Sequence, residues 1–250
     1  AVNFIHAYKT PALIAEYAIN ASLSMLQQKW FLTVDKAEIN FSQGQLTFSA
    51  KIPFSAPYQV DINGDFAFAN LVELKKYLPY QVMNPHLSQW LQTALISSDS
   101  VKGKFGLTGD LKSFPFDHGE GQFKVNAFIH NAVLNFKSDW PNLTRLNAEV
   151  DFTGRAMNIL AKSGTTEGID FQNVTAALSD LSRSSLEIQA KLLTTLEKGQ
   201  HYVNHSPLEN TLGSDLKNFQ LMGALPLTLH ISIPLHEEDV QTKVNGSIAF

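Results

Sequence analysis

The chain has 250 residues, which allows one or two domains, and 44% of its residues are apolar while only 17% are charged. Its net charge of −4 and its lack of a lysine and arginine cluster exclude the basic surface that binding to nucleic acid requires. The absence of cysteine excludes disulfides and thiolate metal sites, and no run of about 18 apolar residues predicts a membrane-spanning helix.

The low charge has two interpretations. Globular domains usually contain about 25% charged residues, so this chain must expose unusually many uncharged side chains. Either serine, threonine, asparagine and glutamine cover an ordinary β protein, or a large apolar surface is covered by a ligand, a lipid or another part of the protein.

The first element, over residues 13–25, is compatible with a strand or a helix. Its alanines and Pro11 suit a helix, because proline is favoured in the first helical turn. We favour a strand because the larger residues alternate, as Leu13, Ala15, Tyr17, Ile19, Ala21, Leu23 and Met25.

Alternation with a period of two residues then dominates the chain. Successive side chains of a strand point to opposite faces, so each such segment has one apolar and one polar face, as is typical of antiparallel sheets. We therefore predict a mainly β protein in which residues 1–250 form one continuous unit, a long antiparallel sheet with a few short helices. The alternating segments are 46–54, 60–68, 123–129, 146–152, 186–192, 227–233 and 240–250.

An apolar residue followed by Asn or Thr and then Gly recurs along the chain. Gly64, Gly109 and Gly154 are 45 residues apart, and Gly246 follows after about two such periods. The pattern is either a structural repeat or a coincidence. Glycine inside an alternating strand marks a bulge or bend, so we expect the sheet to curve like a groove.

Helical patterns are few. Asn84 and Pro85 suit the cap and first residue of a helix whose apolar face reaches Leu95. Shorter helical segments are expected over 71–78 and 193–205. We expect these helices to cap or plug the sheet.

No cluster of polar residues predicts catalysis or a cofactor. Residues 117–120 (Asp-His-Gly-Glu) have the composition of a solvated loop, although an acid–base pair of a hydrolase or a metal is conceivable there. His201 and His205 would share one face of a helix, yet Pro207 ends that helix soon afterwards, so we expect an exposed helix end without metal. The acidic segment 236–239 is expected to be a turn.

The apolar faces of the strands are therefore the candidate functional surface. They are either the core between two packed sheets or the open face of one curved sheet that binds acyl chains, and the low charge favours the open face. The candidate lipid-groove residues are Phe48, Ile52, Phe66, Phe68, Val125, Ile129, Val150, Phe152, Ile188, Leu229, Ile231 and Ile233.

Short motifs that contain proline or tryptophan separate the predicted strands. Their order resembles the central region of YhdP-type proteins, a branch of the AsmA-like envelope proteins of Gram-negative bacteria that is related to TamB. The resemblance covers residues 60–250, and residues 1–59 match only in their β character. Ser97-Ser98-Asp99 departs from it, because a glycine is expected at that turn. The motifs, in order, are Tyr77-Leu78-Pro79, Trp90-Leu91, Phe114-Pro115-Phe116, Trp140-Pro141 with Leu143, Ser206-Pro207-Leu208 and Ile233-Pro234-Leu235.

The resemblance implies a non-enzymatic periplasmic segment of a longer protein. That protein would be anchored in the inner membrane by a helix outside this chain, and its β-groove would pass phospholipid toward the outer membrane. Other segments of the same long chain would be its neighbours. The alternative is a scaffold or chaperone-like module for outer-membrane biogenesis that acts through sheet edges.

The prolines and tryptophans of these motifs also have a physical interpretation. Proline cannot donate to a strand ladder, so Pro79, Pro115, Pro207 and Pro234 are expected at strand ends, edges or turns. Tryptophan combines a large apolar body with one donor, so we expect Trp90 and Trp140 to hold a helix or loop onto the sheet.

Overall fold

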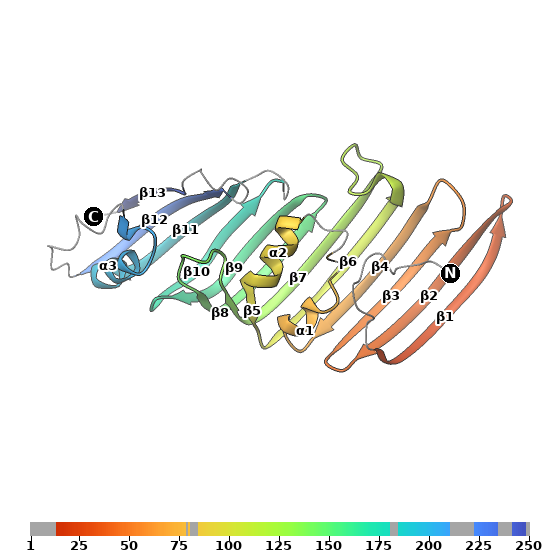
Figure 1. Ribbon diagram of the computed structural model, residues 1–250, viewed down its shortest axis with the longest axis horizontal. Helices are drawn as coiled ribbons and strands as arrows, with labels where there is room; N and C mark the ends of the chain where they lie inside the picture. The colour runs from red at the N-terminus through yellow and green to blue at the C-terminus, as the bar shows by residue number, and fades with distance from the viewer. Residues whose placement is uncertain are drawn as a thin grey trace.

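The computed structural model describes residues 14–78, 80, 85–180, 185–210, 223–234 and 242–248. Within these residues the chain forms one open antiparallel sheet of 13 strands, with three α-helices and one 3-10 turn, η2 (Leu111–Ser113). The strands lie side by side along the longest axis of the molecule (Figure 1). They are β1 (Ile14–Leu26), β2 (Lys29–Phe41), β3 (Gly44–Pro53), β4 (Gln59–Phe68), β5 (Leu95–Ser97), β6 (Ser100–Asp110), β7 (Gly121–Leu134), β8 (Leu143–Thr153), β9 (Ala156–Thr166), β10 (Ile169–Leu178), β11 (Ser185–Thr195), β12 (Ala224–Pro234) and β13 (Lys243–Ile248).

The order of the strands in the sheet follows their order in the chain. The path runs from β1 to β13, and only the short β5 lies off it, paired with β7. Alternating strands joined by short connections form such a meander because each strand pairs with the strand just before it. The prediction of a long antiparallel sheet is therefore confirmed.

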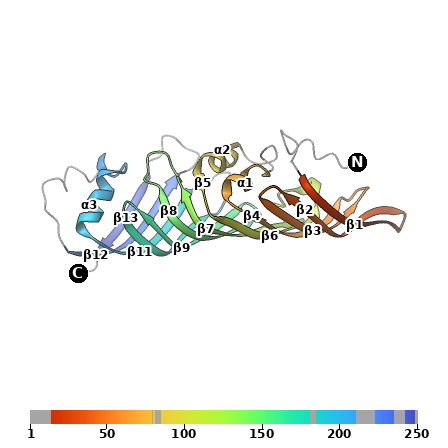
Figure 2. The ribbon, with the colours of Figure 1, turned by 90° about the horizontal axis from the view of Figure 1, so that it is seen from below.

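The helices lie on one side of this sheet. They are α1 (Leu71–Lys75), α2 (Pro85–Ala94) and α3 (Leu196–Asn204), and Figure 2 shows all three on the same side of the strands. The Asn70 side chain begins α1 by accepting a hydrogen bond from the amide of Glu73 at 2.9 Å. Leu71 and Leu95 are buried beside Val101 of β6, so this insertion between β4 and β6 packs against the sheet through apolar side chains.

Bulges curve the sheet near its centre. Asn131 in β7 and Arg145 in β8 have φ of 49° and 51°, and the pairing register shifts at both. Asn173 in β10 has a φ of 53°. The Arg145 guanidinium fixes its bulge by donating to the hydroxyl of Thr165 at 2.6 Å and to the carboxylate of Asp170 at 2.9 Å. A bulge bends its strand and increases the local twist. The sequence predicted such bends at glycines, whereas these bulges lie at asparagine and arginine residues.

Phenylalanine rings lie over glycines on the helix side of the sheet. In each case the two residues are direct cross-strand partners, and a Cβ atom on the glycine would overlap the ring. The absence of a glycine side chain therefore lets each ring lie flat against the neighbouring strand. In the strands that the structure describes, the pairs are Gly44 with Phe68, Gly64 with Phe105, Gly103 with Phe66, and Gly164 with Phe171.

The structure settles several local predictions. The first element is a strand, β1, as we favoured, and Pro85 begins α2 as predicted; Leu13 and Asn84 lie outside the described residues. Helix α3 is shorter than predicted, because residues 193–195 complete β11. The glycine repeat is wrong as a structural repeat, because Gly64 is inside β4 whereas Gly154 is in the turn before β9.

Candidate functional site: the apolar face of the sheet

An unbroken row of apolar residues crosses the sheet from one edge to the other. Directly paired residues of neighbouring antiparallel strands point to the same face, so the registers trace which side chains lie together. We call this set the central row, and it runs along the long axis of the sheet. From β1 to β13 it consists of Tyr17, Ile39, Leu46, Phe66, Gly103, Ala127, Val150, Ile159, Ala176, Ile188, Ile231 and Val244.

All twelve predicted groove residues lie on the face that carries the central row. Four of them belong to the row itself: Phe66, Val150, Ile188 and Ile231. The others lie in parallel rows on either side, with Phe48, Val125, Phe152, Ile233 and, further out, Ile52 on one side, and Phe68, Ile129 and Leu229 on the other. The structure therefore brings residues from six strands onto one apolar surface.

This surface is only partly covered. Phe68, Val150 and Ile233 are buried, with 6%, 9% and 1% of their surface exposed, whereas the other nine predicted residues are half-buried. Cover comes from the helices and from side chains of loops, and no second sheet packs on this face among the described residues. Of the two alternatives, the single curved sheet is confirmed and the two-sheet sandwich is wrong.

The opposite face of the same strands is polar. Lys104 pairs with Asp65 at 3.1 Å, and Lys162 pairs with Glu149 at 3.1 Å. Hydrogen bonds from Lys162 and Asn126 keep the pKa of Glu149 below its usual value. Because charges gather on one face and apolar groups on the other, the sheet is amphipathic across most of its length.

An aromatic bridge connects α2 to α3 over the apolar face. The indole of Trp90 on α2 donates to the carbonyl of Phe136 at 3.0 Å, and the Phe136 ring packs on the cluster that contains Val150. Phe136 contacts Trp140 with ring centroids 5.6 Å apart, and Trp140 lies 6.4 Å from Tyr202 of α3. The prediction that Trp90 and Trp140 hold a helix or loop onto the sheet is confirmed. Burial raises the pKa of Tyr202 to about 12.

Three of the four prolines lie in the part of the chain that the structure describes, and they lie in turns or at the ends of elements, as predicted. Pro115 lies in the turn after η2, Pro207 follows α3, and Pro234 is the last residue of β12. Pro79 lies outside the described residues.

Residues 117–120 form a loop in which the acidic groups have other partners. Arg155 donates two hydrogen bonds to the carboxylate of Asp117, at 2.7 and 3.0 Å, and holds its pKa below the usual value. The backbone amide of His118 donates to Glu120 at 3.1 Å. Residues 117–120 are therefore an exposed loop, as predicted, and Arg155 ties this loop to the β8–β9 turn.

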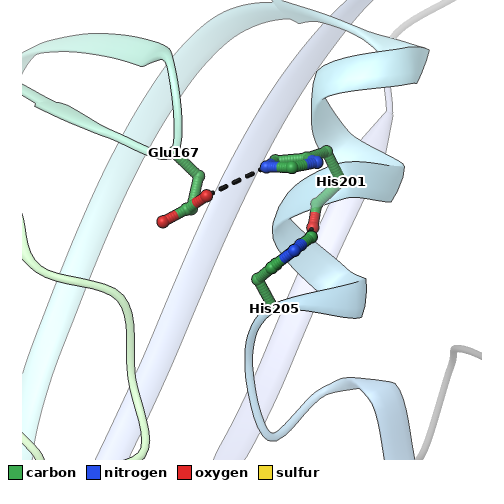
Figure 3. A group of neighbouring side chains, drawn as sticks. All are labelled: Glu167, His201 and His205. Carbon is green, nitrogen blue, oxygen red and sulfur yellow. Dashed lines mark hydrogen bonds and ion pairs between the residues drawn. The ribbon is translucent and has the colours of Figure 1, made fainter.

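The two histidines of α3 have a third neighbour that the sequence did not indicate. Glu167, in the turn between β9 and β10, lies beside His201, with 2.9 Å between its carboxylate and the imidazole Nε2 (Figure 3). His205 follows one turn later on the same face of α3. The acidic segment 236–239 lies outside the described residues.

The sequence reasoning missed the parts of the apolar surface that come from β2, β6, β9 and β10. In β9, Met157, Ile159 and Ala161 alternate and would have predicted that strand. Phe136 and Tyr202 come from a loop and a helix, where alternation carries no information. No helix in the described part of the chain is long and apolar enough to cross a membrane.

Comparisons with known proteins found a family model and a relative that match this chain. The model of the family described as YhdP protein matches residues 1–250, including the 59 N-terminal residues. The intermembrane phospholipid transporter YhdP of Escherichia coli (strain K12) is 32% identical over 168 residues, which are 67% of this chain. The chain spans 13% of the length of that relative. No solved structure matches the chain.

Proposed function

The chain belongs to the YhdP family, and from this premise we propose that it is a non-enzymatic segment of an envelope protein that binds and passes phospholipid between the inner and outer membranes. The observation that carries the proposal is the central row, an apolar stripe that crosses every strand of the path from β1 to β13. The name of the relative in E. coli supplies the class of ligand.

The length of the row favours passage over storage in one pocket. Neighbouring strands lie about 4.8 Å apart, so twelve strands give a stripe of roughly 50 Å. One leaflet contributes about half of the roughly 30 Å hydrocarbon core, so the stripe is several acyl-chain lengths long. Each methylene that leaves water contributes about 0.8 kcal/mol, which lets an acyl chain bind anywhere along the stripe without a specific contact.

We further propose that the sheet continues into other segments of the same long protein. The outer edge of β1 is unpaired among the described residues, and its apolar side chains are exposed, with Tyr17 at 68%, Leu23 at 60% and Met25 at 62%. A long exposed edge attracts other strands unless it is covered. An adjoining strand would extend the central row, within a periplasmic segment anchored elsewhere in the protein.

The scaffold alternative rests on the same edge. If β1 instead pairs with other outer-membrane proteins, crosslinkers placed at Ser22 or Ser24 will capture foreign polypeptides. Capture of segments of the same protein supports the continuous groove.

Lipid that co-purifies with the chain tests the proposed function. We expect native mass spectrometry of the chain from a Gram-negative host to show bound phospholipid. Ile188→Asp places a charge in the central row and should remove most of the bound phospholipid. Gln189→Asp places the same charge one residue along, on the polar face, and should retain the phospholipid. Wild-type protein without lipid, or equal lipid in both variants, would contradict the proposal.

A further inference from the structure

Glu167, His201 and His205 form a cluster of metal-ligating side chains at the edge of the apolar face. Glu167 is in the two-residue turn between β9 and β10, where Glu167 and Gly168 both have positive φ, 45° and 73°. Two residues with positive φ are typical of a type I′ hairpin turn. His201 is in the last turn of α3 and His205, four residues later, is its C-cap, so the two histidines lie on the same side of the helix end.

Glu167 and His201 face each other, and His205 lies below His201 at the end of α3 (Figure 3). One carboxylate oxygen of Glu167 and one ring nitrogen of each histidine all lie within 4.8 Å of one another. His201 Nε2 is 2.9 Å from the Glu167 carboxylate, and the two imidazole rings lie 4.1 Å apart between centroids. The cluster therefore joins two elements that are more than 30 residues apart in sequence.

The hydrogen bonds fix which nitrogen of His205 carries a lone pair. Nδ1 of His205 lies 2.8 Å from the carbonyl oxygen of His201, which can only accept, so Nδ1 is the donor. The neutral ring then has its lone pair on Nε2. Metal-binding histidines commonly donate their second nitrogen to a carbonyl or carboxylate in this way.

We infer that Glu167, His201 and His205 form a site for a divalent transition metal ion of the Zn²⁺ type. Two imidazoles and one carboxylate are ligands that Zn²⁺ accepts, with water in the fourth position. A tetrahedral site with bonds of about 2.0 Å has ligands roughly 3.3 Å apart, so the side chains must close by a small rotation. Both histidines are exposed, which leaves room for that rotation.

The ion takes the place of the proton that His201 now shares with Glu167. His201 Nε2 gives up that proton, to its own Nδ1 or to solvent, and its lone pair binds the metal while the Glu167 carboxylate binds alongside. Lys198, one turn earlier on α3, donates to the carbonyl of Gly168 at 2.7 Å, so its positive charge lies near the site and lowers the affinity. Acid weakens binding further because protonated imidazole cannot bind a metal.

A bound ion would clamp α3 to the β9–β10 turn. Helix α3 already meets β12 where Gly199 lies close to Leu225, and it meets the β9–β10 turn through Lys198, so the ion would strengthen a contact that exists without it. No ligand residue belongs to the central row, so variants at these positions leave the row itself unchanged.

Calorimetric titration of the tag-free chain with ZnCl₂ tests the inference. We expect one equivalent to bind, with His201→Ala and His205→Ala each weakening binding at least tenfold and Glu167→Gln weakening it less. His230→Ala is the matched control, because His230 also pairs with a glutamate, Glu187, at 2.9 Å, and among the described residues no second histidine joins that pair. It should bind Zn²⁺ like the wild type.

Hydrogen exchange gives a second readout that does not depend on affinity. Zn²⁺ should slow amide exchange in α3 of the wild type and leave it unchanged in His201→Ala. The inference is overturned by an absence of binding at millimolar Zn²⁺, by equal loss in His230→Ala, or by wild-type affinity in both α3 histidine variants.

Discussion

The cross-strand pair of Gly164 and Phe171 allows a quantitative test of how the apolar face is packed. A Cβ atom at position 164 would lie 2.3 Å from Cζ and 2.7 Å from Cε2 of the Phe171 ring, with no backbone atom among its closest neighbours. Carbon atoms in contact are about 3.5–4.0 Å apart, so the ring must move by more than about 1 Å. Phe171 is 8% exposed within the main apolar cluster, so that movement disturbs its neighbours.

We therefore expect Gly164→Ala to lower the free energy of unfolding. Overpacking a core costs about 1–3 kcal/mol, and the smaller entropy of the unfolded chain returns about 0.4–1 kcal/mol, which leaves a loss of about 1–2 kcal/mol. Gly106→Ala is the control, because the nearest atom to its Cβ would be the end of the Asn63 side chain at 3.1 Å. That variant should stay within about 0.5 kcal/mol of the wild type.

Urea unfolding followed by circular dichroism measures both variants. Removing the ring with Phe171→Leu should relieve the clash, so the double variant with Gly164→Ala should be more stable than the sum of the single changes predicts, by about 1 kcal/mol. Equal costs for Gly164→Ala and Gly106→Ala, or strict additivity in the double variant, would refute the reasoning.

Other predictions concern the aromatic bridge and the loops. Trp90→Phe keeps the apolar body but removes the donor to Phe136, so urea unfolding should show a loss of about 1 kcal/mol; a loss near zero would contradict the role of this hydrogen bond. Burial raises the pKa of Tyr202 to about 12, whereas a tyrosine in the unfolded chain has a pKa near 10. Its contribution to the free energy of unfolding is therefore complete below pH 10 and is lost as the pH rises through 12. Between these pH values the wild type should lose stability in urea unfolding, whereas Tyr202→Phe, which has no phenol to ionise, should not. Asp117 has a lowered pKa beside Arg155, so its contribution is present above the unfolded pKa and is lost as the pH falls through the folded pKa; the difference in melting temperature between Asp117→Asn and the wild type should disappear in acid.

The sequence predicted the apolar face well because alternation identifies a face without knowledge of the neighbouring strand. Phe66 and Phe68, for example, share a side of β4 wherever that strand lies. Apart from the short β5, the strands pair in the order of the chain, so the faces predicted one by one join into a single surface. The sequence also predicted that helices cap the sheet, but which apolar residues they cover depends on the fold.

Strands with interruptions were missed for identifiable reasons. In β2 the pairing register shifts between Val34 and Ala37, which moves the later residues to the opposite phase. Strand β10 has Asn173 in the left-handed region, and β6 has Gly103 at a position of the apolar face where a larger apolar side chain would have completed the alternation. A search for alternating apolar residues does not recognise a strand in which a bulge or a glycine interrupts the alternation.

The Glu167 cluster shows a different limit. His201 and His205 are close in sequence, and their helical spacing indicated a shared face. Glu167 joins them only because β10 and β11 return the chain to the same edge of the sheet. A third ligand of this kind depends on the topology and needs the structure.

Photocrosslinking tests the central claim, that the apolar face carries acyl chains, most directly. A benzophenone amino acid replaces Phe152 on the apolar face in one variant and Asp151 on the polar face in another, in the intact protein in growing cells. We predict that phospholipid adducts form at position 152 and are at least tenfold fewer at position 151. Equal labelling at the two positions, or adducts only with polypeptide at position 152, would contradict the account.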